Sequence, residues 1–135
     1  MSEPRYRLQY NRLRRATMSR VSKINKEQSD GHWNLVRFRS DAYDACQALE
    51  EIAFADGALS TKTKELMAVS ISIQTGCEAA IQKHIDRAAE QGASFEESLE
   101  AIEVSIAMGG STAAAAAHVA FYALDQVYSR EILKF

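Results

Sequence analysis

The fold of this chain depends on residues 65–84, ELMAVSISIQTGCEAAIQKH. Residues 66–73 are apolar on almost every side, which predicts a buried helix rather than a surface one. Gly76 can adopt the left-handed conformation that ends such a helix. Cys77 then lies in the first turn of the next helix, where unpaired backbone N–H groups and the helix dipole favour a thiolate. We interpret Cys77 as a reactive thiol; the alternative is a small apolar residue that packs in the core.

The spacing of polar residues in this stretch resembles a family motif. Glu65 is followed by eleven residues and Cys77, and then by Ala80 and His84. This order is similar to the Glu-x11-Cys-x-x-Cys-x3-His pattern of the alkylhydroperoxidase D-like (AhpD-like) proteins, which belong to the carboxymuconolactone decarboxylase superfamily. The resemblance extends over roughly residues 40–127, and further short segments carry it: residues 88–94, 96–97 and 107–110.

This resemblance implies an AhpD-like helical bundle, thiol-dependent peroxidase activity and self-association into a trimer or hexamer. In the family, the second motif cysteine attacks the peroxide and the first resolves the product. Ala80 stands at the second position in this chain. By resemblance, Cys77 is therefore the resolving sulfur and the attacking sulfur is missing. The lactone decarboxylases of the same superfamily suggest an alternative, acid–base chemistry on a small organic acid.

Helix geometry relates these positions to one another. Positions 77, 80, 81 and 84 share one face, because steps of three and four residues return to it. At roughly 1.5 Å per residue, His84 lies about 6 Å along the axis from position 80 and about 10 Å from Cys77. In an antiparallel hairpin around Gly76, Glu65 would return to the depth of His84 and orient its imidazole for proton transfer. The alternative is a buried carboxylate that only ties the hairpin together.

Length and composition indicate a single globular domain. The chain has 135 residues, of which 47% are apolar and 25% charged, and it contains one proline. No alternation typical of strands is present, so we expect an all-α fold of six or seven helices. No apolar run follows the basic N-terminus, and the apolar run 113–124 is too short to cross a bilayer. We therefore expect a cytoplasmic protein without a signal peptide or membrane span.

The first thirty residues differ in charge from the rest. They hold eight basic and three acidic residues, a net charge of +5, whereas the remainder has a net charge of −7. Side chains at helical spacing predict an amphipathic arm: Tyr6, Tyr10, Leu13, Thr17, Val21 and Ile24. We expect this arm to pack on the acidic body of its own or a neighbouring subunit. Binding of nucleic acid or an anionic surface is the alternative. The predicted division is an arm and connector over residues 1–35 and an AhpD-like domain over residues 36–135.

Capping residues predict the limits of the helices. Residues 31–39 are expected to form a connector, and Ser40 and Ser60 to cap the two helices that follow. Ser94 and Glu97 form a capping box, while Gly92 and residues 109–110 mark helix ends. In the helix after Ser40, we expect these residues to face inward: Tyr43, Cys46, Leu49, Ile52 and Ala53.

The second cysteine and the remaining histidines are weaker candidates. Cys46 shares its stripe with apolar neighbours, which favours a core position; the alternative is a resolving thiol. His118 follows an alanine run and is expected in the core or at a subunit contact, or else lining the pocket. His32 carries no functional signal.

Three classes of function remain. The first is a thiol-dependent peroxidase in which a peroxide oxidises Cys77 and an external thiol or Cys46 reduces it. The second is an acid–base enzyme that uses Glu65 and His84 on a small organic acid. The third is a non-catalytic oligomer that serves in binding or assembly. Glu65, Cys77, His84 and His118 are possible metal ligands, but no dense ligand pair or nucleotide motif is present, so we expect no metal or other cofactor.

Overall fold

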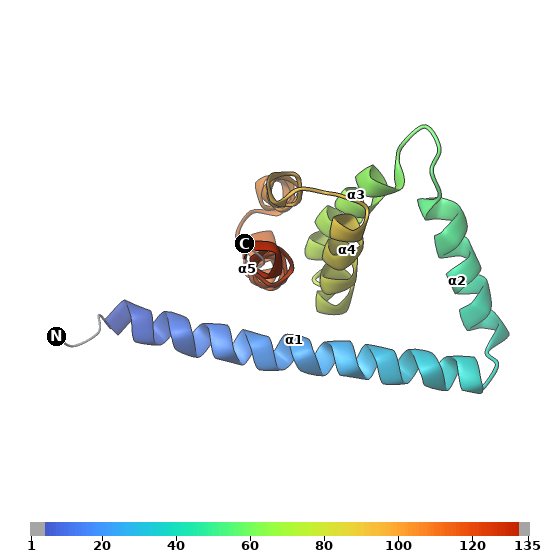
Figure 1. The fold of residues 1–135 in the computed structure, drawn as a ribbon, viewed down its shortest axis with the longest axis horizontal. Coiled ribbons are helices and arrows are strands. Elements are labelled where there is room, and N and C mark those ends of the chain that lie inside the picture. The colour runs from blue at the N-terminus through green and yellow to red at the C-terminus, as the bar shows by residue number, and fades with distance from the viewer. Residues whose placement is uncertain (1–4, 133–135) are drawn as a thin grey trace.

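The computed structural model describes the backbone of residues 5–132 and the side chains of residues 12, 15, 16 and 18–129. It contains five α-helices (Figure 1): α1 (Arg5–Arg37), α2 (Asp41–Phe54), α3 (Thr61–Thr75), α4 (Glu78–Glu90) and α5 (Phe95–Ile132). The last of these consists of two helical sections, because the backbone leaves helical geometry at Gly110, with φ 59° and ψ −141°. No strand occurs in the described residues, and the predicted all-α fold is confirmed.

The core lies between α3, α4 and the two sections of α5, which pack together in Figure 1. Fully buried aliphatic side chains fill it: Val69, Ile73, Ile81, Ile85, Ile102 and Leu124. In the second section of α5, the buried positions are mostly alanines: Ala113, Ala117, Ala120 and Ala123. Because the distance between packed helices depends on the side chains at their contact, these alanines allow the second section to lie close to its neighbours.

Capping hydrogen bonds confirm the predicted helix starts. The hydroxyls of Ser40 and Ser60 each accept a hydrogen bond from the N–H three residues later, at 3.2 and 3.1 Å. Ser94 and Glu97 form the predicted reciprocal box: the Glu97 N–H donates to Ser94 Oγ at 3.1 Å, and the Ser94 N–H donates to Glu97 Oε2 at 2.9 Å. Local sequence therefore determines where α2, α3 and α5 begin.

The turn between α3 and α4 decides the position of the candidate site. Gly76 has φ 66°, and its N–H donates to the carbonyl of Ile73, while the N–H of Cys77 donates to the carbonyl of Ser72. These two bonds make a Schellman motif, which ends α3 at the predicted glycine. The chain reverses here, so α3 and α4 pack side by side as a hairpin.

α1 is longer than the sequence predicted. The connector expected at residues 31–39 is wrong, because the helix continues through Gly31 to Arg37 and ends where Arg39 adopts φ 51°. α1 crosses α4 and α5 (Figure 1), with Val21 buried and Arg20 paired to Glu78 at 2.8 Å. The arm therefore lies on its own body. Four positions of its predicted stripe have side chains outside the described ones: Tyr6, Tyr10, Leu13 and Thr17.

α2 turns a different face to the body from the one predicted, and only Tyr43 belongs to both faces. It stands apart from the core in Figure 1 and buries no residue. Of the expected inward residues only Tyr43 is half-buried, whereas four are exposed: Cys46, Leu49, Ile52 and Ala53. The body side of α2 instead carries Tyr43, Glu50 and Phe54, which make contacts with α1 and α4. The contacts of these three side chains with α1 and α4 therefore orient α2. Its apolar face remains uncovered in the protomer.

One segment of the described chain, Phe95–Ser129, is long and apolar enough to cross a membrane. Length and composition alone are weak evidence for a span, since core helices pass the same test. This segment is interrupted at Gly110 and buries Ile102, Ala117 and Leu124 against the other helices. We therefore assign it to the core of the helical domain.

Candidate functional site

A buried hydrogen bond between Glu65 and His84 forms the centre of the candidate site. Glu65 lies in the second turn of α3 and is only 3% exposed, and His84 lies in the middle of α4. Imidazole Nδ1 is 2.7 Å from Glu65 Oε2. The hairpin at Gly76 thus brings together two residues nineteen positions apart, as the spacing predicted. Buried carboxylates are costly without a partner, so each member of the pair satisfies the other.

The hydrogen bond assigns the two nitrogens of His84 different roles. An ionised carboxylate only accepts hydrogen bonds, so Nδ1 carries the hydrogen that Glu65 receives. In the neutral ring, Nε2 then presents its lone pair. No described residue hydrogen-bonds to Nε2, and this atom is not among the buried atoms that lack a partner. Nε2 is therefore the atom of the pair that can take or give a proton.

Phe54 forms one wall of the site, and the sequence did not point to it. Its ring stacks on the His84 imidazole with centroids 5.4 Å apart and planes 9° from parallel. Phe54 is the last residue of α2 and lies on the same face as Tyr43 and Glu50, at spacings of seven and four residues. That stripe was the available signal, but the stronger apolar stripe of α2 concealed it.

Glu50 links α2 to α4 on either side of His84. Its Oε1 accepts hydrogen bonds from Lys83 and from Arg87 Nη1, the latter at 3.1 Å. Burial raises the pKa of Glu50, but the hydrogen bond from Lys83 and the charges of Lys83, Arg87 and His84 outweigh it and hold the pKa below its usual range. Glu50 is therefore ionised at neutral pH.

Cys77 lies at the start of α4 and is exposed. It is the N-cap residue itself, one position before the first turn in which it was expected, and its side chain makes no capping hydrogen bond. Ala80, where the resemblance places a second cysteine, is half-buried one turn further along α4. No hydrogen bond joins Cys77 to His84 in the described structure. The two lie about 10 Å apart along the helix axis at roughly 1.5 Å per residue, so a proton passing between them needs a bridging group.

The part of the chain that holds these residues matches a family model. The model of the "Carboxymuconolactone decarboxylase family" matches residues 40–121, which include Glu65, Cys77, Ala80 and His84. The chain belongs to the carboxymuconolactone decarboxylase family. Residues 1–39, and α1 with them, lie outside the matched region.

Two other proteins are similar to this chain in sequence. "Uncharacterized protein 4 in cox locus" of Paracoccus denitrificans is 40% identical over 84 residues, which cover 62% of this chain and 76% of the relative. "Uncharacterized protein H16_B0147" of Cupriavidus necator is 30% identical over 96 residues, which cover 71% of this chain and 81% of the relative. Neither name states an activity.

Solved structures of family members have the same fold. The carboxymuconolactone decarboxylase family protein lpg0406 of Legionella pneumophila superposes with a TM-score of 0.75 at 27% identity, covering 80% of this chain and 96% of its own. Protein TM1620 of Thermotoga maritima superposes with a TM-score of 0.73 at 26% identity, covering 83% of this chain and 95% of its own. Involvement in an antioxidative response has been suggested for TM1620.

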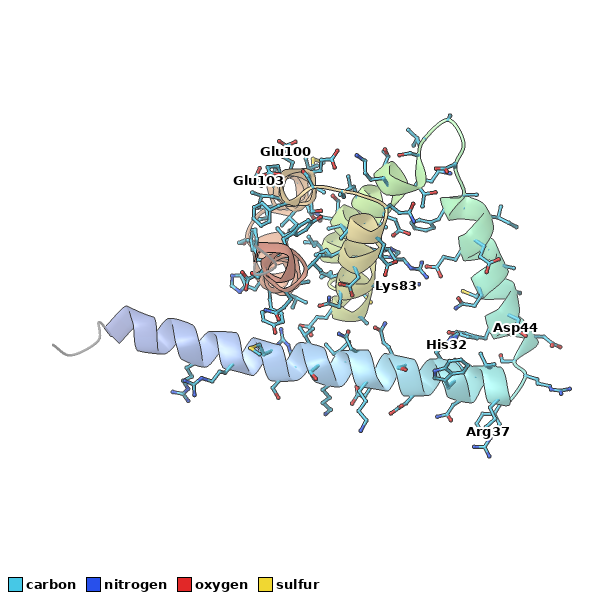
Figure 2. All side chains as sticks on the ribbon, viewed as in Figure 1. His32, Arg37, Asp44, Lys83, Glu100 and Glu103 are labelled. Carbon is cyan, nitrogen blue, oxygen red and sulfur yellow. The ribbon has the colours of Figure 1, made fainter. Side chains whose placement is uncertain are left out.

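The other candidate residues of this family member lie away from the Glu65–His84 pair. Cys46 is exposed on α2, so its predicted core position is wrong, because α2 turns its apolar face outward. His118 is exposed on α5, so it is not a core residue. His32 Nδ1 is 2.7 Å from the hydroxyl of Tyr43 at the corner between α1 and α2, where Figure 2 labels it. Among the described residues, no three His, Cys, Asp or Glu side chains come together as metal ligands.

A separate cavity of about 360 Å³ lies between α1, α4 and α5. Gln82, which is 7% exposed, donates from Nε2 to both oxygens of Asp86, at 3.0 and 3.1 Å, and its Oε1 has no partner among the described side chains. The residues that line the cavity come from three helices and include neither Glu65 nor His84: Met18, Val21, Ser22, Asn25, Gln82, Asp86, Tyr122, Gln126 and Val127. The sequence did not indicate this cavity, because α1 was expected to be an appended arm.

Proposed function

We propose that this protein is a cytoplasmic thiol-dependent peroxidase in which Cys77 is the oxidised thiol and the Glu65–His84 pair moves protons. The observation that carries the proposal is the buried 2.7 Å hydrogen bond between Glu65 and His84, on the same helix hairpin that exposes Cys77. A start-of-helix position favours the thiolate that such chemistry needs. The antioxidative role suggested for the Thermotoga maritima relative supports the same class of reaction.

The proposed reaction consumes one peroxide and two thiols. His84 Nε2 accepts the proton of the Cys77 thiol through a bridging water, and the thiolate attacks one oxygen of the peroxide ROOH. The S–O bond forms, the O–O bond breaks, and the leaving alkoxide takes the proton back as ROH. An external thiol then attacks the sulfenic acid and releases water as a mixed disulfide forms. A second external thiol displaces Cys77 and leaves as the disulfide of the two external thiols.

Selective oxidation of Cys77 tests this proposal. After brief exposure to peroxide, trapping of sulfenic acids with dimedone followed by mass spectrometry is expected to label Cys77 about tenfold faster than Cys46, because only Cys77 lies at a helix N-terminus. Cys46 is exposed as well and is therefore an internal control for accessibility. Equal labelling of the two cysteines would contradict a special role for Cys77.

An acid–base reaction on a small organic acid is the second candidate function. The observation that favours it is that Glu65 and His84 form a complete proton-transfer pair without any contribution from Cys77. Decarboxylation or isomerisation by this pair would persist in a Cys77→Ser variant, whereas the peroxidase reaction would not. Assays of the Cys77→Ser protein with peroxide and with lactone acids therefore separate the two candidates.

We also propose that the protein self-associates as a trimer or hexamer. Large apolar side chains remain exposed on four helices. Besides α1, these are α2 with Leu49 and Ile52, α3 with Met67 and Ile71, and α5 with Val104 and Met108. α3 and the first section of α5 are joined by the bond from Ser70 Oγ to the carbonyl of Ala101, at 2.6 Å. The exposed residues of these two helices flank that bond, so they form one apolar surface.

Light scattering at micromolar concentration is expected to give three or six times the protomer mass of 15.0 kDa. Ile52→Asp, which places a charge on the uncovered face of α2, is expected to reduce the assembly, whereas Asp44→Asn on an exposed position of the same helix is expected to leave it intact. A monomer at all concentrations would contradict this proposal.

A further inference from the structure

α2 is held against the body without burying any residue. Its contacts with α4 come from two side chains one helical turn apart, Glu50 and Phe54. Glu50 reaches Lys83 and Arg87, which lie one position before and three positions after His84 on α4. Figure 2 shows Lys83 between α4 and α2. We call the contacts of Glu50 with Lys83 and Arg87 the clamp.

The stacked ring of Phe54 limits how the imidazole of His84 can lie. With the planes 9° from parallel, rotation of the imidazole about its bond to the helix would drive its edge into the phenyl ring. The bond from Nδ1 to Glu65 fixes the edge of the imidazole, and Phe54 covers one of its faces. Together they determine the direction of the Nε2 lone pair. Glu65 alone would leave the ring free to tilt about that hydrogen bond.

The clamp lies one helical turn from Phe54, where it can keep the phenyl ring in this place. Residues four apart on a helix share a face, so the position of Glu50 on α4 also sets the position of Phe54 over His84. α2 buries no apolar side chain that could hold it there instead, and its bond from Tyr43 to His32 of α1 lies near the other end of the helix. The backbone carbonyl of Phe54 accepts a hydrogen bond from the hydroxyl of Thr61 at 2.8 Å, which anchors the end of α2. This bond does not contact the phenyl ring, whose position depends on how α2 lies against α4.

We propose that Phe54 is a positioning residue for the His84 imidazole and that the clamp of Glu50 with Lys83 and Arg87 keeps it in place. This inference rests on the proposed role of His84 in proton transfer, which it deepens. When the clamp is broken, α2 moves away from α4, the phenyl ring leaves the imidazole, and Nε2 loses its fixed direction. Polar contacts of this kind open more readily than buried apolar ones, so the helix can regulate the site.

The stacking can be measured without reference to any activity. In the parent protein, the ring current of Phe54 is expected to shift the His84 ring protons upfield, and Phe54→Leu is expected to remove this shift, while Phe54→Tyr retains it. Glu50→Gln is expected to move the His84 signals towards their positions in Phe54→Leu. Glu51→Gln makes the same chemical change at an exposed neighbouring position and is expected to leave them unchanged. The ring-proton signals of His118, which is exposed on α5, are expected to stay unchanged in all of these variants and serve as an internal control.

A second route breaks the clamp from α4. Lys83→Met removes one partner of Glu50 and is expected to move the His84 signals in the same direction as Glu50→Gln. In the peroxide assay, Phe54→Leu and Glu50→Gln are expected to lower kcat about tenfold with little change in KM, because part of the contribution of proton transfer is lost.

The two proposals fail in different ways. If Glu50→Gln and Lys83→Met both leave the His84 signals at their parent positions, the clamp does not place Phe54, whatever the activity. If Phe54→Leu leaves them unchanged, the stacking itself is absent in solution. If the signals move as expected while the parent protein shows no peroxide-dependent turnover, Phe54 still positions His84, and the peroxidase proposal alone is rejected.

Discussion

The Ala80→Cys variant is expected to oxidise external thiols with peroxide about tenfold faster than the parent protein, or more. Position 80 lies one turn before His84 on the same face of α4, and helical side chains tilt towards the N-terminus, so His84 reaches back over position 80. A thiol placed there is closer to Nε2 than Cys77 is. A nearby base accelerates deprotonation of the thiol and therefore the attack on the peroxide. Cys77, one turn away, would then be able to close a disulfide with it. The rate of peroxide-dependent thiol consumption measures the effect.

A matched control is available at the preceding residue. Ala79→Cys also places a thiol at a half-buried alanine of α4, but rotated about 100° from the face that His84 shares. We expect little gain from it. His84→Ala in the Ala80→Cys background is expected to reverse most of the gain, and Cys77→Ser in the parent protein to abolish the remaining activity. Equal rates of peroxide-dependent thiol consumption in the parent, Ala79→Cys and Ala80→Cys proteins would contradict the peroxidase proposal. They would favour acid–base chemistry by Glu65 and His84.

The Glu65→Ala variant is expected to have the largest effect on stability, lowering the free energy of unfolding by about 2–4 kcal/mol. It leaves the Nδ1 hydrogen of His84 buried without an acceptor, and it opens a cavity between α3 and α4. Urea unfolding followed by circular dichroism at one fixed protein concentration measures the change, since self-association would contribute to stability.

Two further variants separate the hydrogen bond from the change in charge. Glu65→Gln keeps a carbonyl oxygen that can accept from Nδ1, so we expect it to cost about 1 kcal/mol or less. Glu103→Ala removes a carboxylate from the exposed face of α5, where Figure 2 labels it, and is expected to change stability by less than about 0.5 kcal/mol. If Glu65→Ala were as mild as Glu103→Ala, the buried pair would not hold the hairpin together.

Local sequence was sufficient for the starts of α2, α3 and α5, for the end of α3 and for the central pair of the site, but not for the end of α1. The capping bonds of Ser40, Ser60 and the Ser94–Glu97 box join residues only three positions apart. These helix starts can therefore be predicted without knowing the tertiary structure. The end of α3 at Gly76 is also local, because it depends on the left-handed backbone conformation of this single glycine. Once the chain reverses there, the spacing of Glu65 and His84 from the turn is enough to bring them side by side.

Only the tertiary structure decided the orientation of α2, and with it the surroundings of His84. The apolar period of α2 predicted that Cys46, Leu49 and Ile52 are buried against the body, but these residues are exposed. Periodicity tells which face of a helix is apolar; it does not tell whether this protomer covers that face. Glu50 instead meets Lys83 and Arg87, thirty-three and thirty-seven residues later in the chain. Contacts over such separations depend on how α3 and α4 pack first, so the stacking of Phe54 on His84 could be seen only in the folded chain.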